Sequence, residues 1–371
     1  MVFNSIFFIF CFLPVFMLIY YLVPGKLRNL LLFLGSLIFY AWGEPVYVIL
    51  MLFSSIFNYY MGTELERLYY DDRKQKINLI FSIIINLAVL VFFKYYGFLL
   101  NTIGGIIGIH IPHPELSLPI GLSFYTFRNL SYLFDIYLSK VSAQRNFLTF
   151  SVYSTMFPYT SAGPIVRYTD IETQLKQRTI NISKFGIGAE LFVKGLAKKV
   201  LLADNLSVLY SSICGHPQMS VFTSWLGILA YTMQLYFDFS GYSDMAIGLG
   251  KMLGFDFNKN FDYPYISTSV SEFWRRWHIS LGSWFRDYIY IPLGGNRVST
   301  LKHIRNILVV WALTGLWHGA SWNFVFWGVY YGLLLLAEKF LLGRFLCLFH
   351  YGICFVFILF CFQYRGKEFL R

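Results

Sequence analysis

One histidine interrupts an apolar stretch near the C-terminal end of the sequence. Residues 311–327 read WALTGLWHGASWNFVFW, in which His318 is the ionisable side chain. An ionisable side chain at membrane depth is expensive, so by default it faces the protein interior and indicates function. A neutral imidazole there could take the proton from a hydroxyl that attacks a thioester carbonyl. The alternative is a core histidine bonded to a nearby Ser or carbonyl, and the local sequence leaves both interpretations open.

Aromatic and small residues accompany this histidine at helical spacing. If the segment is one helix, Trp311, Gly315, His318 and Trp322 share a face. Glycines on or beside that face allow a backbone or a ligand to approach closely. The pattern predicts an aromatic-walled notch that binds substrate, formed by Trp311, Gly315, Trp317, Gly319 and Trp322.

A second polar and aromatic segment spans residues 265–297. Ser269 and Glu272 form an S-x-x-E pattern, which predicts a helix start because each side chain can satisfy a free backbone donor. Aromatic and Leu residues follow at helical spacing as far as Tyr288, and Pro292 precedes two glycines that end the predicted helix. A helix rich in Trp and Arg is typical of the membrane interface.

The same segment also offers groups for binding an anionic donor. Arg275, Arg276 and Arg286 lie off the apolar stripe, and planar guanidinium groups pair bidentately with phosphate. We therefore expect them to bind the phosphates of an acyl-coenzyme A. His278 is placed on this helix, where it either orients the donor or makes a structural hydrogen bond.

The elements that carry these residues belong to an integral membrane protein. Of the 371 residues, 57% are apolar and 13% are charged, against about 25% charged in soluble domains. Apolar runs recur from Phe3 to Phe362, and several are shorter than the ~20 residues of a straight span. The sequence predicts an all-α polytopic protein of roughly ten transmembrane or re-entrant helices, in one domain over residues 1–371.

The distribution of charged residues also fits an integral membrane protein. In a soluble protein, the net charge of +11 would suggest nucleic-acid binding. Here most basic residues lie at the ends of apolar runs, where the cytoplasmic loops of membrane proteins carry an excess of Lys and Arg. We therefore expect a multi-pass protein of the cell membrane, in contact with membrane lipid and not with nucleic acid. The run from Phe3 to Val23 is expected to stay as a first transmembrane helix.

Other polar residues are weaker candidates. Asp238 and Asp244 could pair with a cation, although Ser240, Ser243 and Asp244 also look like the start of a helix. The loop histidines at 110 and 113 have no nearby carboxylate or Cys, so no metal site is expected there. The cysteines at 347, 354 and 361 form a helix stripe that favours packing.

Five ordered blocks of the sequence resemble the membrane-bound O-acyltransferase (MBOAT) family, and in particular the bacterial branch of the alginate O-acetylation protein with its peptidoglycan and teichoic-acid relatives. The blocks begin at residues 118, 157, 236, 271 and 313, and they read LPIGLSFYTFRNLSYLFDIY, FPYTSAGPIVRY, YFDFSGYSDMAIGLGKMLGF, SEFWRRWHISLGSWFRDYIYIPLGGNR and LTGLWHGASWNFVFWGVYYG.

The resemblance implies a fold, a site and partners. It implies an intramembrane tunnel, with His318 in the position of the family's essential histidine and His278 in that of its second recurrent one. It also implies an O-acetyltransferase that uses cytosolic acetyl-coenzyme A as donor substrate, without a bound cofactor. The acetyl group would pass through an extracytoplasmic acetyltransferase partner, of the SGNH type or related, to a polysaccharide such as alginate or a cell-wall polymer.

Two features depart from the family pattern. Arg128 stands where Gln is more usual, and residues from about 338 to 371 match poorly. The chain is therefore expected to be truncated or frameshifted there. The alternative function is a transporter, or a scaffold subunit of a polysaccharide-modification complex without catalysis of its own, although the sequence shows no repeated halves.

Overall fold

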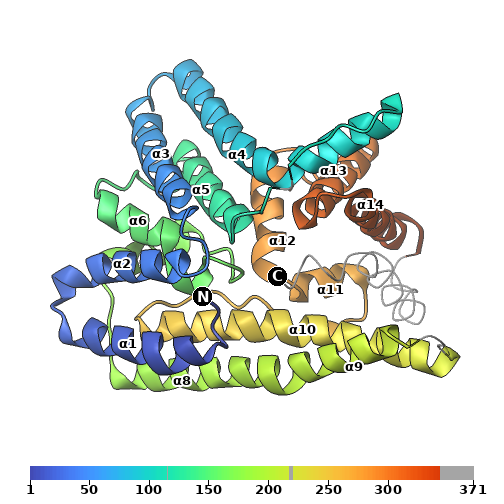
Figure 1. Ribbon diagram of the computed structural model, residues 1–371. Coiled ribbons are helices and arrows are strands. Elements are labelled where there is room, and N and C mark those ends of the chain that lie inside the picture. The colour runs from blue at the N-terminus through green and yellow to red at the C-terminus, as the bar shows by residue number, and fades with distance from the viewer. Residues whose placement is uncertain (115, 217–219, 343–371) are drawn as a thin grey trace. The chain divides into compact units, whose positions relative to one another are not determined.

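The computed structural model describes residues 1–114, 116–216 and 220–342, and every regular element in this part of the chain is helical (Figure 1). The predicted all-α class is therefore confirmed for the described residues. Residues 343–371, with the predicted cysteine stripe and most of the atypical C-terminal segment, lie outside them.

The chain divides into two compact units. The first comprises residues 1–192 and 245–258, and the second comprises residues 193–244 and 259 onward, so α8 and α10 each contribute to both. The helices that begin in the first unit are α1 (Leu13–Leu22), α2 (Arg28–Ala41), α3 (Val48–Arg67), α4 (Asp72–Ile107), α5 (Leu122–Tyr137), α6 (Phe147–Thr155), α7 (Tyr168–Lys176) and α8 (Ile182–Ala197). Those that begin in the second are η4 (Lys198–Ala203), α9 (Asp204–Cys214), α10 (Val221–Met252), η5 (Pro264–Ile266), α11 (Val270–Arg276), α12 (Ile279–Phe285), η6 (Arg286–Tyr290), α13 (Thr300–His318), α14 (Trp322–Ala337) and η7 (Glu338–Leu342).

In the first unit, α3, α4 and α5 pack against one another. The side chains of Asn58 on α3 and Asn86 on α4 exchange two hydrogen bonds of 3.0 and 2.8 Å. Polar pairs of this kind join helices in a membrane, where apolar contact alone gives little preference for one partner. The α4 helix begins at a capping side chain, Asp71, and ends at Gly108, whose φ of 71° suits glycine.

Three helical segments of the described residues are long and apolar enough to cross a membrane. They are Val48–Arg67, Asp72–Ile107 and Trp322–Leu341, and Phe8–Leu22 is a shorter apolar helix. The predicted number of roughly ten membrane segments is therefore not confirmed. Many helices have 7 to 16 residues, which at ~1.5 Å per residue do not reach across ~30 Å of hydrocarbon when straight.

Arg128 on α5 is completely buried in the first unit. Its guanidinium donates to the backbone oxygens of Tyr159 at 2.6 Å and Ser154 at 3.0 Å, and it lies 4.5 Å from the centroid of the Tyr159 ring. Arg128, at the position where the resemblance leads us to expect Gln, therefore fixes the turn that follows α6 by hydrogen-bonding two backbone carbonyls.

The second unit is built around the antiparallel pair α13 and α14, which lie side by side in Figure 1. The start of α11 packs on α14, where Val270 joins Trp327 and Tyr331 in a buried cluster that also includes the Trp274 ring. In the same unit α10 continues without a break through residues 240–244. The predicted helix start at Ser240, Ser243 and Asp244 is therefore wrong.

Candidate active site

The helix predicted across residues 269–288 begins as expected. Ser269 accepts a hydrogen bond from the Glu272 backbone N–H at 3.1 Å, and the Glu272 carboxylate accepts from the N–H of Thr268 at 2.9 Å. The Glu338 carboxylate adds a third acceptor for the start of α11, at 2.8 Å from the Val270 nitrogen. These bonds satisfy donors that a helix N-terminus leaves free.

The predicted continuous helix is wrong at His278. The chain breaks there into α11 and α12, and His278 has φ 43° and ψ 54°, in the left-handed region. A left-handed non-glycine residue costs ~1–2 kcal/mol. Hydrogen bonds with the segment around Asn260 offset this cost, because Ile279 N–H donates to the Asn260 backbone oxygen at 2.9 Å and Asp262 N–H donates to the Arg276 backbone oxygen at 2.9 Å.

The Asn260 side chain sets the orientation of the His278 ring. Its Oδ1 accepts from the Ser280 backbone N–H at 3.2 Å and from the Ser280 hydroxyl at 2.8 Å, and it lies 3.2 Å from His278 Nδ1. The opposite amide nitrogen donates to Ser243 Oγ at 3.1 Å. A backbone N–H can only donate, so the atom facing Nδ1 is the amide oxygen, which favours the His278 tautomer with its hydrogen on Nδ1.

The free nitrogen of His278 therefore has its lone pair in an aromatic chamber. The Phe239 ring lies edge-on at 4.8 Å, and the rings of Phe261 and Trp317 lie at 6.4 and 5.9 Å. Nε2 is buried and makes no hydrogen bond within the part of the chain that the structure describes. Burial lowers the pKa of the His278 imidazole well below its usual value, and the nearby His318 lowers it further.

His318 occupies the last position of α13, directly after Trp317. Its ring centroid lies 5.0 Å from that of Trp317 and 4.9 Å from that of Trp327. Its side chain is half-buried, whereas His278 is 2% exposed. The structure thus brings the two predicted histidines against one buried tryptophan.

The predicted helical face through Trp322 is wrong, because α13 ends at His318. Gly319 adopts an extended backbone with φ −165°, and Trp322 begins the next helix, with its side chain 51% exposed. Trp311 does stay on α13, and its ring lies 4.8 Å from that of Trp274. Of the predicted aromatic walls, Trp317 therefore contacts both histidines, and Trp322 lies on the helix that follows α13.

The close approach predicted at the two glycines is made by the protein itself. A Cβ on Gly315 would collide with the Phe324 backbone oxygen and lie 3.2 Å from Gly328 Cα, and a Cβ on Gly319 would collide with the Phe324 ring. These glycines therefore let α13 and α14 pack closely, and through that contact they place His318.

The three predicted phosphate-binding arginines differ in their surroundings. Arg276 Nε lies 2.9 Å from Glu272 Oε1, and Arg286 Nε lies 2.7 Å from Asp287 Oδ1, so both already face carboxylates. Arg275 is exposed. Their role towards phosphate stays a prediction, and Arg275 is the one whose charge the described residues leave available.

The predicted cation partners of Asp238 and Asp244 are present. Lys199 lies 2.9 Å from Asp238, and Lys198 lies 2.6 Å from Asp244. These pairs join η4 to α10 within the second unit. They account for two carboxylates in an apolar helix without any chemical role.

The sequence reasoning missed Asn260, Phe239 and Phe261, which form the wall around His278. No spacing pattern links them to it, because Asn260 and Phe261 lie in the loop after α10 and Phe239 lies within that helix. A polar residue between Lys259 and Asp262 resembles an ordinary exposed loop in sequence. Its 1% exposure is the result of tertiary pairing with the segment 276–280.

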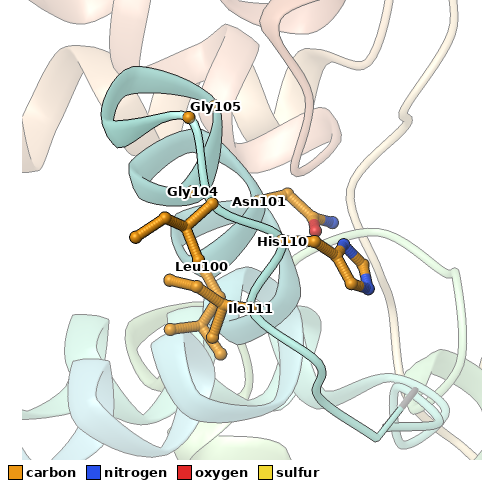
Figure 2. Close-up of a pocket in the computed structure, with 8 residues that line it drawn as sticks. Leu100, Asn101, Gly104, Gly105, His110 and Ile111 are labelled. Atoms are coloured by element: carbon orange, nitrogen blue, oxygen red, sulfur yellow. The ribbon is translucent and has the colours of Figure 1, made fainter.

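A cavity of about 300 Å³ lies in the first unit, at the C-terminal end of α4 (Figure 2). His110 is the ionisable side chain among its lining residues and is exposed, as predicted for this loop. Within the described residues no group of three or more His, Cys, Asp and Glu side chains could hold a metal ion. Because the other lining residues are Leu, Ile, Gly and Asn, the cavity offers no second group for acid–base chemistry.

The fold and site define a helical, membrane-bound protein with a buried histidine and a half-buried one beside the same tryptophan. The sequence pattern of the membrane-bound O-acyltransferase family matches residues 44–364, and the chain belongs to this family. It is 44% identical to the probable alginate O-acetylases AlgI of Pseudomonas aeruginosa and Azotobacter vinelandii, over 91% of this chain and 66% and 69% of theirs. It is 35% identical to the peptidoglycan O-acetyltransferase of Helicobacter pylori, over 91% of this chain and 70% of that protein. The chain thus spans about two thirds of the length of these relatives.

Proposed function

We propose that this chain is a membrane-bound O-acyltransferase that supplies acetyl groups for O-acetylation of an extracytoplasmic polysaccharide. The observation that carries the proposal is the His278–Trp317–His318 arrangement, in which two imidazoles lie against the same indole and one of them has a buried Nε2 without a hydrogen bond in the described structure. Family membership and the relatives named for alginate and peptidoglycan O-acetylation support it.

His318 is the proposed general base. Its neutral imidazole takes the proton of the acceptor hydroxyl as the oxygen attacks the thioester carbonyl carbon. The carbon–sulfur bond then breaks, and the proton passes to the departing thiolate. The thioester is already activated, so the reaction needs neither a bound cofactor nor a metal.

His278 is the proposed second catalytic residue. With Nδ1–H directed at Asn260, its Nε2 accepts a hydrogen bond from the reacting hydroxyl or thiol. The walls of Phe239, Phe261 and Trp317 exclude water, which would otherwise compete as nucleophile and hydrolyse the donor. Trp311, Gly315 and Gly319 support this chamber through the contacts of α13 and α14.

The donor is proposed to be cytosolic acetyl-coenzyme A. Its phosphates would meet Arg275, Arg276 and Arg286, of which the exposed Arg275 would contribute most because its charge is not matched by a carboxylate. Trp322 is exposed near the start of α14 and would contact the pantetheine arm or the acceptor.

The membrane location and the route of the acetyl group are proposed from membership of the membrane-bound O-acyltransferase family. We propose a multi-pass protein of the inner or plasma membrane, with roughly ten transmembrane or re-entrant helices around an intramembrane tunnel in a single domain. The acetyl group would leave through an extracytoplasmic acetyltransferase partner, of the SGNH type or related. Alginate and cell-wall polymers are both acceptors of this kind.

Cells that lack the protein provide the test. Polysaccharide-bound O-acetyl ester is measured after complementation with the native chain or with His318→Ala at matched membrane abundance. Rescue by the native chain alone supports the proposal. Equal rescue by both would make His318 structural and would favour the scaffold alternative, and rescue by neither would show that this chain is inactive.

A further inference from the structure

Two arginines in the first unit share one buried tyrosine. The guanidinium carbons of Arg28 and Arg178 each lie 5.8 Å from the centroid of the Tyr20 ring, and Tyr20 is completely buried. Within the described residues neither arginine forms an ion pair, and both side chains are half-buried. Two like charges are thus held near one ring with no carboxylate to offset them.

Arg178 is fixed in place by neutral groups. Its Nε donates to the Tyr20 hydroxyl at 2.8 Å, its Nη1 donates to Asn29 Oδ1 at 2.8 Å, and the group lies 4.7 Å from the Phe255 ring centroid. Its Nη2 is buried and has no hydrogen-bond partner among the described residues. The guanidinium plane is therefore ordered in advance while its charge stays uncompensated.

Arg28 presents its charge at a helix start that has no cap. It is the first residue of α2, whose first turn has neither a capping side chain nor an acidic residue, and its Nε is buried without a partner in the described part of the chain. The positive end of the helix dipole adds to the potential of the two arginines. By contrast, α4 is capped by Asp71 and α11 by Ser269.

Neighbouring cations are matched by acids. Lys184 and Lys251 each lie 2.8 Å from a carboxylate oxygen of Asp256. The Asp256 backbone N–H donates to the Gln174 side chain at 2.7 Å, and Gln174 precedes Arg178 by four residues. The charges of these two lysines are therefore matched, whereas that of Arg178 is not.

We propose that Arg28 and Arg178 form a binding site for a phosphate ester. Guanidinium groups bind phosphate oxygens bidentately, and a phosphate would complete the polar partners that both side chains lack. The apolar helix Phe8–Leu22 ends just before the site, which places it where an apolar element meets polar groups. The phosphate belongs either to an anionic lipid headgroup or to a soluble nucleotide-type donor. A soluble donor would make this site part of the proposed acyl transfer and would rest on that function. A lipid-binding site does not depend on it.

Binding to the full-length chain in detergent tests this site. The probes are micelles doped with phosphatidylglycerol, micelles doped with phosphatidylcholine, and adenosine 3′,5′-bisphosphate without lipid, each followed by the shift in thermal unfolding. Arg28→Gln is the main variant because the Arg28 side chain makes no hydrogen bond in the described structure, so the substitution breaks none. Lys26→Gln removes an exposed charge two residues away and serves as the matched control. Arg178→Lys keeps the charge and removes the planar fork.

We expect Arg28→Gln and Arg178→Lys each to weaken the binding of the probe that stabilises the native protein about tenfold, which equals ~1.4 kcal/mol. Lys26→Gln should change this affinity less than twofold. A phosphatidylglycerol response identifies a lipid phosphate, and a bisphosphate response identifies a soluble donor. Equal weakening by Lys26→Gln and Arg28→Gln would overturn the site in favour of diffuse surface charge. No difference between native protein and Arg28→Gln with any probe would overturn it as well.

Discussion

Replacing Asn260 with alanine should slow turnover by about tenfold at neutral pH. The amide oxygen is the acceptor that holds the hydrogen on His278 Nδ1, and a net hydrogen bond is worth ~1–1.5 kcal/mol. Losing that preference lowers the ratio of the tautomer with its lone pair on Nε2 to the other tautomer by about 5- to 10-fold, because ~1.4 kcal/mol is a factor of ten. The ring also loses its orientation.

The same substitution should destabilise the protein. The Ser280 backbone N–H and hydroxyl both donate to the Asn260 side chain and would be left buried without that acceptor. Each such group costs ~1–3 kcal/mol. The turnover number must therefore be measured on folded protein, quantified by gel filtration in detergent, with release of coenzyme A from acetyl-coenzyme A as the assay.

Asn260→Asp separates positioning from folding. Aspartate keeps the acceptor towards His278 Nδ1, so turnover at neutral pH should recover most of the loss seen with alanine. Its negative charge raises the pKa of His278, so the loss of activity on acidification should begin at higher pH than in the native protein. Ser243→Ala removes only the far partner of the amide and should reduce turnover less than Asn260→Ala.

Two results would refute this reasoning. Native turnover in folded Asn260→Ala, with only a lower unfolding temperature, would make Asn260 purely structural. Equal losses in Asn260→Ala and Asn260→Asp with unchanged pH profiles would show that the histidine tautomer does not matter.

Three further predictions concern stability. The pKa of His278 is lowered in the folded protein, while it is about 6.5 in the unfolded protein. The unfolded state therefore binds the proton at a higher pH, so the stability from this group is full above about pH 6.5 and falls as the pH drops towards the folded pKa. His278→Gln should flatten that fall in a series of thermal-unfolding measurements. Gly315→Val should lower the free energy of unfolding by ~1–3 kcal/mol or more, because its side chain would collide with the Phe324 backbone oxygen between α13 and α14, and chemical denaturation in detergent measures this. Asn58→Leu should cost ~1–3 kcal/mol by leaving the Asn86 amide without its partner, whereas the double change with Asn86→Leu should cost less than the sum in a double-mutant cycle, and strict additivity would rule out coupling.

The features predictable from sequence are those fixed by local or compositional signals. Apolar content indicated helices in a membrane because buried backbone groups there must be bonded within the segment. The cap at Ser269 was predictable because its partner, Glu272, is three residues away. The pairing of Asp238 and Asp244 with cations was predictable because a charged side chain inside an apolar helix is stabilised by an opposite charge.

The features that sequence could not supply depend on distant contacts. The break at His278 exists because the Asn260 segment bonds the backbone on both sides of it, and no periodicity within residues 269–288 signals that. The end of α13 at His318 depends on packing against α14, where Gly315 meets Phe324. A helical projection that continues to Trp322 misplaces that ring for this reason.

The measurement that tests the central claim most directly is single-turnover release of coenzyme A from acetyl-coenzyme A by the purified chain and two variants. His318→Gln removes the proposed base, and His303→Gln changes another buried histidine on the same helix, which bonds the Tyr290 hydroxyl at 2.9 Å. We predict a loss of at least about 100-fold with His318→Gln, since general-base catalysis contributes ~10²–10⁴, and a change below about threefold per folded molecule with His303→Gln. Equal rates in the native protein and His318→Gln would contradict the proposed catalytic role.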